Sequence, residues 1–158
     1  MSFNLELFMY YVGQLFLVPT LVLISLLFVY SFFALGQFMM LSYRRQSGRA
    51  RPLVVYAGEN PNATDDELDL YAHKLLEFPR IASRVTPMLG LVATMIPMGP
   101  ALKSLSDGNF ADVSNNLSIA FSAVILALIA ASITYYIANI RRRWLAEELI
   151  EITQKRGI

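Results

Sequence analysis

The 158-residue sequence contains no cysteine, a single histidine and few charged side chains, which make up 16% of the chain. A soluble domain carries about a quarter charged residues, whereas 56% of these residues are hydrophobic. The absence of cysteine excludes disulfide-stapled secretion and thiolate chemistry, and the apolar content excludes intrinsic disorder. One histidine leaves little room for metal ligation or general-base catalysis, and a net charge of +1 gives no electrostatic footprint for nucleic acid. These properties predict a membrane protein that is not an enzyme and has no metal, no cofactor and no nucleic-acid partner.

Three apolar stretches are each long enough to cross a bilayer, which takes about 20 apolar residues. The first covers residues 11–42 and has no charged side chain from Tyr11 to Leu41. No basic residue precedes it, and its apolar part is about twice as long as that of a signal peptide, so we do not expect cleavage. The second stretch covers residues 87–105 and the third residues 117–140. The sequence therefore predicts an all-α integral membrane protein with three transmembrane helices.

Basic residues gather on one side of these predicted spans. Seven of the thirteen Lys and Arg residues lie in residues 43–86 and five lie in residues 141–158, whereas residues 1–10 and 106–116 have none. Cytoplasmic segments next to membrane helices are rich in Lys and Arg. We therefore expect the N-terminus outside, and the long loop and the C-terminus in the cytoplasm.

The connecting segments also carry local signals. They are, in order, the outer interfacial residues 1–10, the cytoplasmic loop 43–86, the external loop 106–116 and the cytoplasmic C-terminal helix 141–158. Residues 1–10 could equally form a disordered start. Thr64 and Glu67 form a capping box for an amphipathic helix at about residues 65–78, and Asn116 is expected to cap the third span. The C-terminal helix is expected to keep its acidic residues on the wet side, namely Glu147, Glu148 and Glu151.

The third span has two different sides. At about 100° per residue, polar side chains fall along one side and small side chains along the other. The polar stripe consists of Ser118, Ser122, Ser132 and Tyr136, and the small-residue ridge of Ala120, Ala123, Ala127, Ala131, Thr134 and Ala138. The stripe predicts a pore-lining surface, although a serine can instead donate to its own backbone four residues back. The ridge predicts close helix packing, above all at Ala120, Ala127 and Ala131.

The second span is two-faced as well. Its small side is formed by Thr86, Gly90, Ala93, Thr94, Pro97 and Ala101, and its bulky side by Leu91, Val92, Met95, Met98 and Leu102. We expect Gly90 and Ala93 to pack against another helix and Thr86 and Thr94 to lie on a pore-lining path. Pro97 and Pro100 are expected to kink the helix, with Pro97 freeing a carbonyl near Ala93. The second and third spans would form the inner wall, and the first would face lipid.

A sequence motif at the start of the second span resembles a known family. The run Thr86-Pro-Met-Leu-Gly-Leu-Val-Ala-Thr94 resembles the Pro-Leu-Leu-Gly-Leu-Leu-Gly-Thr signature of the MotA/TolQ/ExbB proton channel family. The third span, followed by three arginines, is similar to that family's last membrane helix, and the topology is of the ExbB and TolQ type. The sequence departs from the family at Val124, where a threonine is usual, and at Gln37, where an acid is usual. Together with Pro97 and Pro100, these departures indicate a divergent branch of archaeal type.

The resemblance implies an assembly rather than bond chemistry. It implies a ring, a homopentamer, around a central pore in the inner (cytoplasmic) membrane. The pore would hold the membrane helices of a single-span ExbD-, TolR- or MotB-like partner whose Asp carries the proton, which fits the lack of Asp, Glu, His and Arg inside the spans. Thr94 would then lie on the pore side, and ion flow would turn the ring. The alternative is a non-conducting ring of the same fold that binds a partner protein or a lipid in its pore.

Overall fold

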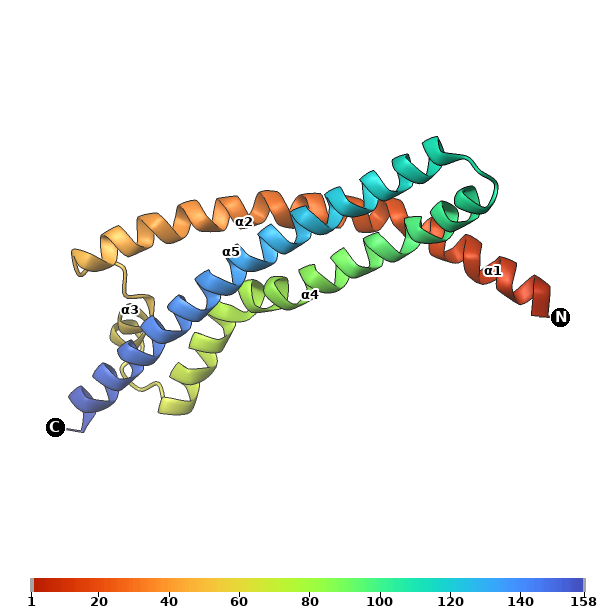
Figure 1. Cartoon of the computed structure of the whole chain (residues 1–158). Coiled ribbons are helices and arrows are strands. Elements are labelled where there is room, and N and C mark those ends of the chain that lie inside the picture. The colour runs from red at the N-terminus through yellow and green to blue at the C-terminus, as the bar shows by residue number, and fades with distance from the viewer. Residues whose placement is uncertain (1, 158) are drawn as a thin grey trace. The chain divides into compact units, whose positions relative to one another are not determined.

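The computed structural model describes residues 2–157, nearly all of which are helical. The helices are α1 (Ser2–Leu15), α2 (Leu17–Gln46), α3 (Pro52–Glu59), α4 (Asp65–Ser106) and α5 (Phe110–Arg156), as Figure 1 shows. No strand occurs among the described residues. The stretches long and apolar enough to cross a membrane are Phe3–Gln46, Asp65–Ser106 and Phe110–Arg156. The expected all-helical chain with three candidate membrane-spanning helices is confirmed.

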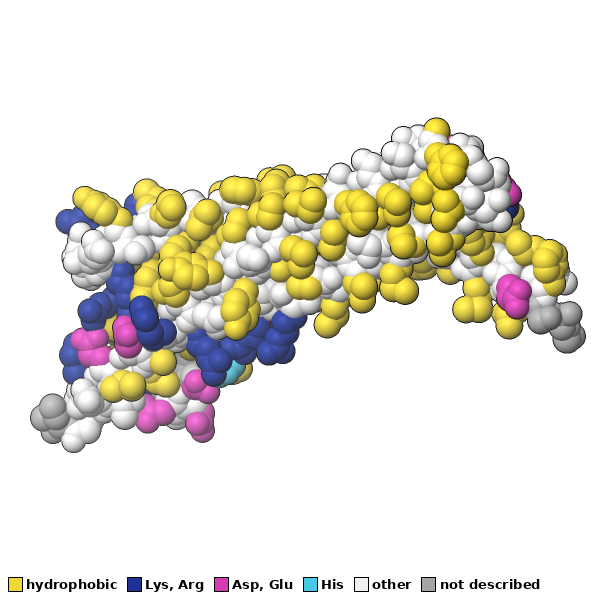
Figure 2. Space-filling model, in the orientation of Figure 1, with side chains coloured by type: hydrophobic (Ala, Val, Ile, Leu, Met, Phe, Trp, Pro, Cys, Tyr) yellow, Lys and Arg dark blue, Asp and Glu magenta, His cyan; other side chains and the backbone are white. Residues whose placement is uncertain are grey.

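The chain divides into two compact units. The first, here called the apolar unit, comprises the residues up to Tyr30 together with Arg84–Ala131. The second, here called the basic unit, comprises Ser31–Ser83 and the residues from Ser132 onward. All Lys and Arg residues except Arg84 and Lys103 belong to the basic unit, and Figure 2 shows such side chains gathered on one part of the surface.

The first predicted span is interrupted at Phe16, between α1 and α2. Pro19 has no backbone N–H to give to the carbonyl of Leu15, so a continuous helix would leave that acceptor unpaired. Instead α2 starts with its own bonds, because both the N–H and the hydroxyl of Thr20 donate to the carbonyl of Phe16, at 3.0 and 2.6 Å. The start of the chain, expected to be interfacial or disordered, is helical from Ser2 onward, while Met1 lies outside the described residues.

The turn between α4 and α5 is much shorter than the expected external loop, residues 106–116. Gly108 ends α4 with a φ of +75°, and the N–H of Asn109 donates to the carbonyl of Ser104 at 2.9 Å, as in a Schellman motif. The side chain of Asn109 then caps α5 by accepting the N–H of Asp112 at 3.3 Å. The expectation that Asn116 caps this helix is wrong, because its side chain donates to the Asp112 carbonyl inside α5.

The predicted amphipathic helix at residues 65–78 is the first part of α4. The capping box is confirmed: the N–H of Thr64 donates to Glu67 Oε2 at 2.9 Å, and the N–H of Glu67 donates to Thr64 Oγ1 at 3.2 Å. The helix does not end where the amphipathic pattern ends, since Pro79 is buried within it. One continuous helix of 42 residues therefore replaces the expected helix, linker and span.

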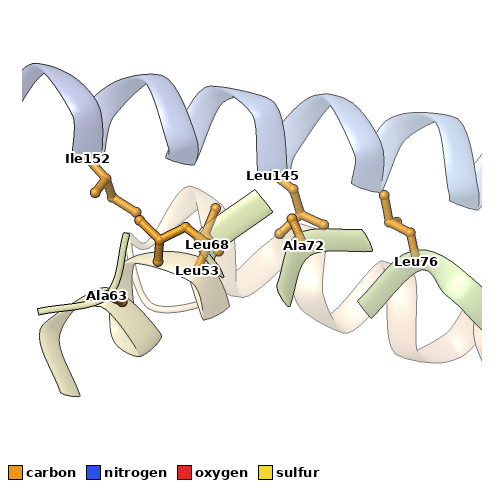
Figure 3. Packing of buried hydrophobic residues seen from close by; sticks show 7 residues of the cluster. All are labelled: Leu53, Ala63, Leu68, Ala72, Leu76, Leu145 and Ile152. Carbon is orange, nitrogen blue, oxygen red and sulfur yellow. The ribbon is translucent and has the colours of Figure 1, made fainter. Parts of the chain in front are cut away.

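The core of the basic unit lies where the last part of α5 meets α3 and the first turns of α4 (Figure 3). Its buried members are Leu53, Ala63, Leu68, Ala72, Leu76, Leu145 and Ile152. The helix α3 was not expected from the sequence. Its first residue, Pro52, brings a φ suited to a helix start and needs no N–H partner. This core fixes the position of α3 beside the last turns of α5.

Candidate functional site

Within the apolar unit, α4 and α5 approach closely through small residues. Ala93 and Ala127 are both fully buried, and Ile24 of α2 packs into the same cluster. A Cβ added at Gly90 would lie only 2.9 Å from the Cβ of Ala127, so glycine is needed at this contact. The small side of α4 thus faces α5 of its own chain.

Five of the residues expected to pack are buried in the structure, whereas Ala138 of the small-residue ridge is only partly buried. The five are Gly90, Ala93, Ala120, Ala127 and Ala131. Ala130, which the sequence analysis did not select, is also fully buried. Its spacing of three residues after Ala127 is the signal that could have identified it.

The opposite side of α4 carries an exposed apolar row. Its members are Met88, Leu91, Met95, Met98, Leu102 and Leu105, with exposed fractions from 41% to 65%. Successive members are three or four residues apart, which is the spacing of a helix–helix seam. This row is an apolar surface about five turns long, with no acidic or basic side chain among its members.

The two threonines expected on the pore path are placed differently. Thr86 is buried, with 1% of its surface exposed. Thr94 is partly exposed at the edge of the exposed row, and its hydroxyl donates to the carbonyl of Leu91 at 2.7 Å. Val124, at the position where the family usually has threonine, lies against Gly90, since a Cβ there would be 3.6 Å from its methyl group. Of the two threonines, only Thr94 has a partly exposed surface.

The first two serines of the polar stripe lie in a groove beside α2. Ser118 and Ser122 are exposed and line a groove of about 330 Å³ together with Ser25 of α2. The hydroxyl of Ser25 donates to its own helix, to the carbonyl of Leu21 at 2.9 Å. The rest of this groove is apolar, so its hydroxyls are the groups available to a polar ligand or a water chain.

The last two residues of the polar stripe, Ser132 and Tyr136, belong to the basic unit, and both are exposed. Tyr136 meets Phe38 edge to face at a centroid distance of 6.0 Å. Phe38 in turn stacks on Trp144 at 5.2 Å, with an interplanar angle of 8°. Ser132 and Tyr136 therefore share the exposed side of α5, and Tyr136 is fixed in place by an aromatic neighbour on α2.

The helix α4 continues through both prolines expected to kink it. Pro100 cannot donate to the carbonyl of Ile96, and the side chain of Gln14 supplies that bond instead, from Nε2 at 3.2 Å. Pro97, whose ring is buried, was expected to leave a free carbonyl near Ala93. The carbonyl that accepts a hydrogen bond from another helix is instead that of Ile96, about one turn further along α4. Sequence reasoning missed Gln14, although an amide in an apolar stretch is itself a signal of a required partner.

A buried carboxylate, Glu148, organises the basic unit. Only 1% of it is exposed, and it forms an ion pair with Arg45 while accepting the N–H of Leu53 at 2.9 Å. It thereby caps α3, whose preceding residue offers no side-chain bond. Arg45 also donates to the carbonyl of Trp144 at 3.1 Å and lies 5.0 Å from the centre of its ring. The expectation that Glu148 lies on the wet side is wrong, because only the tertiary fold brings Arg45 and α3 to it.

Glu151, one turn further on, lies at the surface. Arg51 contacts its carboxylate at 2.5 Å and Lys155 at 3.2 Å. The hydrogen bond from Lys155, together with the positive charge of Arg51, lowers the pKa of Glu151 below the ordinary value of about 4.5. No cluster of three or more His, Asp or Glu that could hold a metal ion occurs within residues 2–157.

Comparison with known proteins identifies the family. Residues 61–154, more than half of the chain, match the model of the MotA/TolQ/ExbB proton channel family. No curated protein and no solved structure matches the chain. The matched range contains all of α4 and nearly all of α5, so it includes the small-residue contact, the exposed row and the buried Glu148. The chain is therefore a multi-pass membrane protein that belongs to the MotA/TolQ/ExbB proton channel family.

Proposed function

We propose that the chain is the channel-forming stator subunit of a motor driven by the proton-motive force. Several copies, five by family likeness, surround the membrane helices of a single-span ExbD-, TolR- or MotB-like partner in the inner membrane. The observation that carries this proposal is the exposed row of α4, an uncharged surface in a family of proton channels. Since the predicted spans contain no Asp or Glu, the proton-binding carboxylate comes from the partner.

The chemistry of the exposed row suits a partner that turns. Methionine side chains are flexible and repack easily, so Met88, Met95 and Met98 can contact a helix in several rotational positions. A row without charges or buried hydrogen bonds gives no single position a large energetic advantage. The small side of α4 is already used by α5, which leaves the exposed row to face the pore.

The proton path is proposed to use the few hydroxyls near these surfaces. Thr94 lies at the edge of the exposed row, and Ser118, Ser122, Ser132 and Tyr136 lie on the exposed side of α5. Thr86 is buried, so any part it plays is through the packing around it. A hydroxyl both donates and accepts, so it can pass a hydrogen bond between the partner's carboxyl group and a water chain.

A flux measurement tests this function. The chain is co-purified with its single-span partner, reconstituted into liposomes, and proton uptake is followed with an internal pH dye under an applied potential. Thr94→Val is expected to abolish most of the uptake. Thr153→Val is the matched control, because that hydroxyl also bonds its own helix, at 2.8 Å from the carbonyl of Leu149, but lies in the C-terminal part of α5. Unchanged flux in Thr94→Val would contradict the assigned path.

Topology and assembly can be tested independently of flux. The chain has no cysteine, so single cysteines introduced at Ser47 and Asp107 report their side of the membrane without background. We expect a membrane-impermeant maleimide added to intact cells to label Asp107→Cys and leave Ser47→Cys unlabelled. Native mass spectrometry of the complex should give five copies of this chain, and a monomer would contradict the ring.

The runner-up function is a non-conducting ring that holds a protein or lipid in its pore. Two observations favour it: the Thr94 hydroxyl is already bonded to its own backbone, and Val124 packs against Gly90 with no hydroxyl to offer. Such a ring would also co-purify with a partner, and the native mass of its complex would equal that of the stator complex. It would show no proton uptake with the intact partner, whereas the stator would.

A further inference from the structure

The basic unit contains a large pocket that plays no part in the proposed proton path. Its volume is about 770 Å³, and it lies between the end of α2, the start of α3 and the part of α5 near Trp144. Five arginines line it, namely Arg44, Arg45, Arg49, Arg51 and Arg141. Only two carboxylates line it, Glu59 and Glu148, so positive charge is in excess.

The arginines of the pocket fall into two groups. Arg45 is paired with Glu148, and Arg51 is paired with Glu151. The other three, Arg44, Arg49 and Arg141, form no ion pair with any carboxylate among residues 2–157. A fold rarely brings unpaired like charges together around one cavity without a counter-charge, because their mutual repulsion is unfavourable. An anion in the pocket would offset this repulsion.

Arg51 gives an independent indication of an anion in the pocket. One of its terminal nitrogens donates to Glu151 at 2.5 Å, but its Nε is buried and has no hydrogen-bond partner. A buried donor without an acceptor is costly. Arg51 lines the pocket, and a small shift of its side chain would let an anionic oxygen there accept this N–H.

The lining of the pocket also includes aromatic and apolar residues. Trp144 and Leu41 line it together with Tyr56 and Tyr71, whose rings stack at a centroid distance of 4.0 Å. Leu41 and Arg141 mark the places where the first and third predicted spans end. A site with arginines at the polar end of membrane helices and apolar residues beside them suits a phosphate carried by an amphiphile.

We propose that this pocket binds a phosphate group. Guanidinium groups match phosphate oxygens in planar, bidentate geometry, and arginine is favoured over lysine where such geometry matters. The pocket contains five arginines and no lysine. The phosphate can belong to the headgroup of an anionic phospholipid or to a free ion, and the experiment below distinguishes these sources. The proposal does not depend on proton conduction.

Trp144 provides a direct readout, because it is the single tryptophan of the chain and lines the pocket. The intact complex in detergent is titrated with brominated phosphatidylglycerol, with brominated phosphatidylcholine, and with inorganic phosphate. We expect phosphatidylglycerol to quench Trp144 emission at concentrations about thirtyfold lower than phosphatidylcholine, which corresponds to contacts from two arginines at about 1 kcal/mol each. Displacement of this quenching by millimolar inorganic phosphate would assign the site to the phosphate group itself.

Two neighbouring variants separate a specific site from general charge. Arg141→Gln removes an unpaired arginine that lines the pocket, whereas Arg142→Gln removes the next one, which lies outside it. We expect Arg141→Gln to weaken the phosphatidylglycerol titration about fivefold and Arg142→Gln to leave it unchanged. Both variants should retain the helical content of the parent. Equal losses in the two variants, or no preference for a phosphate-bearing anion, would overturn the proposal.

Discussion

Different kinds of interaction stabilise the interior of the apolar unit and the interior of the basic unit. In the apolar unit the contact between α4 and α5 is made by Gly90, Ala93, Ala123 and Ala127, with no ion pair among these residues. In the basic unit a buried ion pair, Arg45 with Glu148, lies beside a leucine-rich core. Small residues permit close backbone approach in lipid, where burying apolar surface gains little.

This difference predicts where each unit is sensitive to substitution. The small-residue contact depends on shape. Larger side chains within it should therefore lower the stability of the apolar unit, whereas charge substitutions outside it should have little effect. The buried pair of Arg45 and Glu148 depends on each charge having its partner. The basic unit should therefore lose most stability when only one of the two is removed. Mutations in each unit can break this contrast or sharpen it.

The largest effect is expected for Glu148→Ala. It leaves the charge of Arg45 and the N–H of Leu53 without their partner. Breaking a buried ion pair in this way costs about 3–5 kcal/mol of stability. Thermal unfolding of the purified protein in detergent, followed by circular dichroism, should show a large fall in the melting temperature.

The neighbouring Glu147 provides the control for this prediction. It also faces Arg45, at 3.5 Å, but its side chain is 58% exposed. Glu147→Ala should therefore cost no more than about 1 kcal/mol. If both alanine variants melt at the same temperature, the buried pair is not what organises the basic unit. Arg45→Met combined with Glu148→Leu should recover much of the loss, since it removes both charges together.

The next largest effect is expected for Gly90→Ala in the apolar unit. Its new Cβ would meet that of Ala127 at 2.9 Å, and overpacking of this kind costs about 1–3 kcal/mol. Gly99→Ala in the same helix is the control, because its nearest neighbour is a ring atom of Tyr10 at 4.0 Å. That control should gain roughly 0.5–1 kcal/mol from helix propensity. Adding Ala127→Gly to Gly90→Ala should restore stability, and a lack of rescue would place the contact elsewhere.

The features of the fold that follow from local patterns could be predicted from the sequence. The long apolar stretches predict the three candidate spans, and Thr64 with Glu67 predicts the start of α4 correctly. The helical period also separates the small side of α4 from its bulky side, which the structure leaves exposed. These signals depend only on neighbours within a few turns of one helix.

The features that depend on distant residues could not be predicted. Glu148 caps α3 through Leu53, a residue 95 positions away, so its own helix pattern gives no sign that it is buried. Gln14 bonds the carbonyl of Ile96 across 82 positions. The partial exposure of Thr94 and the burial of Thr86 likewise depend on which side of α4 the fifth helix covers. The roles of the pore residues remain predictions.

A smaller effect is expected for Gln14→Leu, which tests whether a single polar contact matters in the apolar unit. The lost hydrogen bond to Ile96 should cost about 0.6 kcal/mol, the average for such bonds between membrane helices. Pro100→Ala restores a backbone N–H that can donate to the same carbonyl. In that background Gln14→Leu should cost nothing measurable, and a double-mutant cycle of melting temperatures checks this coupling. Equal costs in both backgrounds would show that Gln14 acts through some other contact.

The smallest effect is a pH dependence in the basic unit. Lys155 and Arg51 lower the pKa of Glu151 below about 4.5 in the folded chain, so the unfolded chain takes up the proton first as the pH falls. The stabilisation from this carboxylate is therefore complete at neutral pH and is lost as the pH falls from about 4.5 through the lowered pKa. Glu151→Gln lacks it at every pH, so the melting temperatures of the parent and the variant should differ at pH 7 and converge in acid. A difference that persists in acid would mean that Glu151 acts through packing and not through its charge, and the two units would then differ less than proposed.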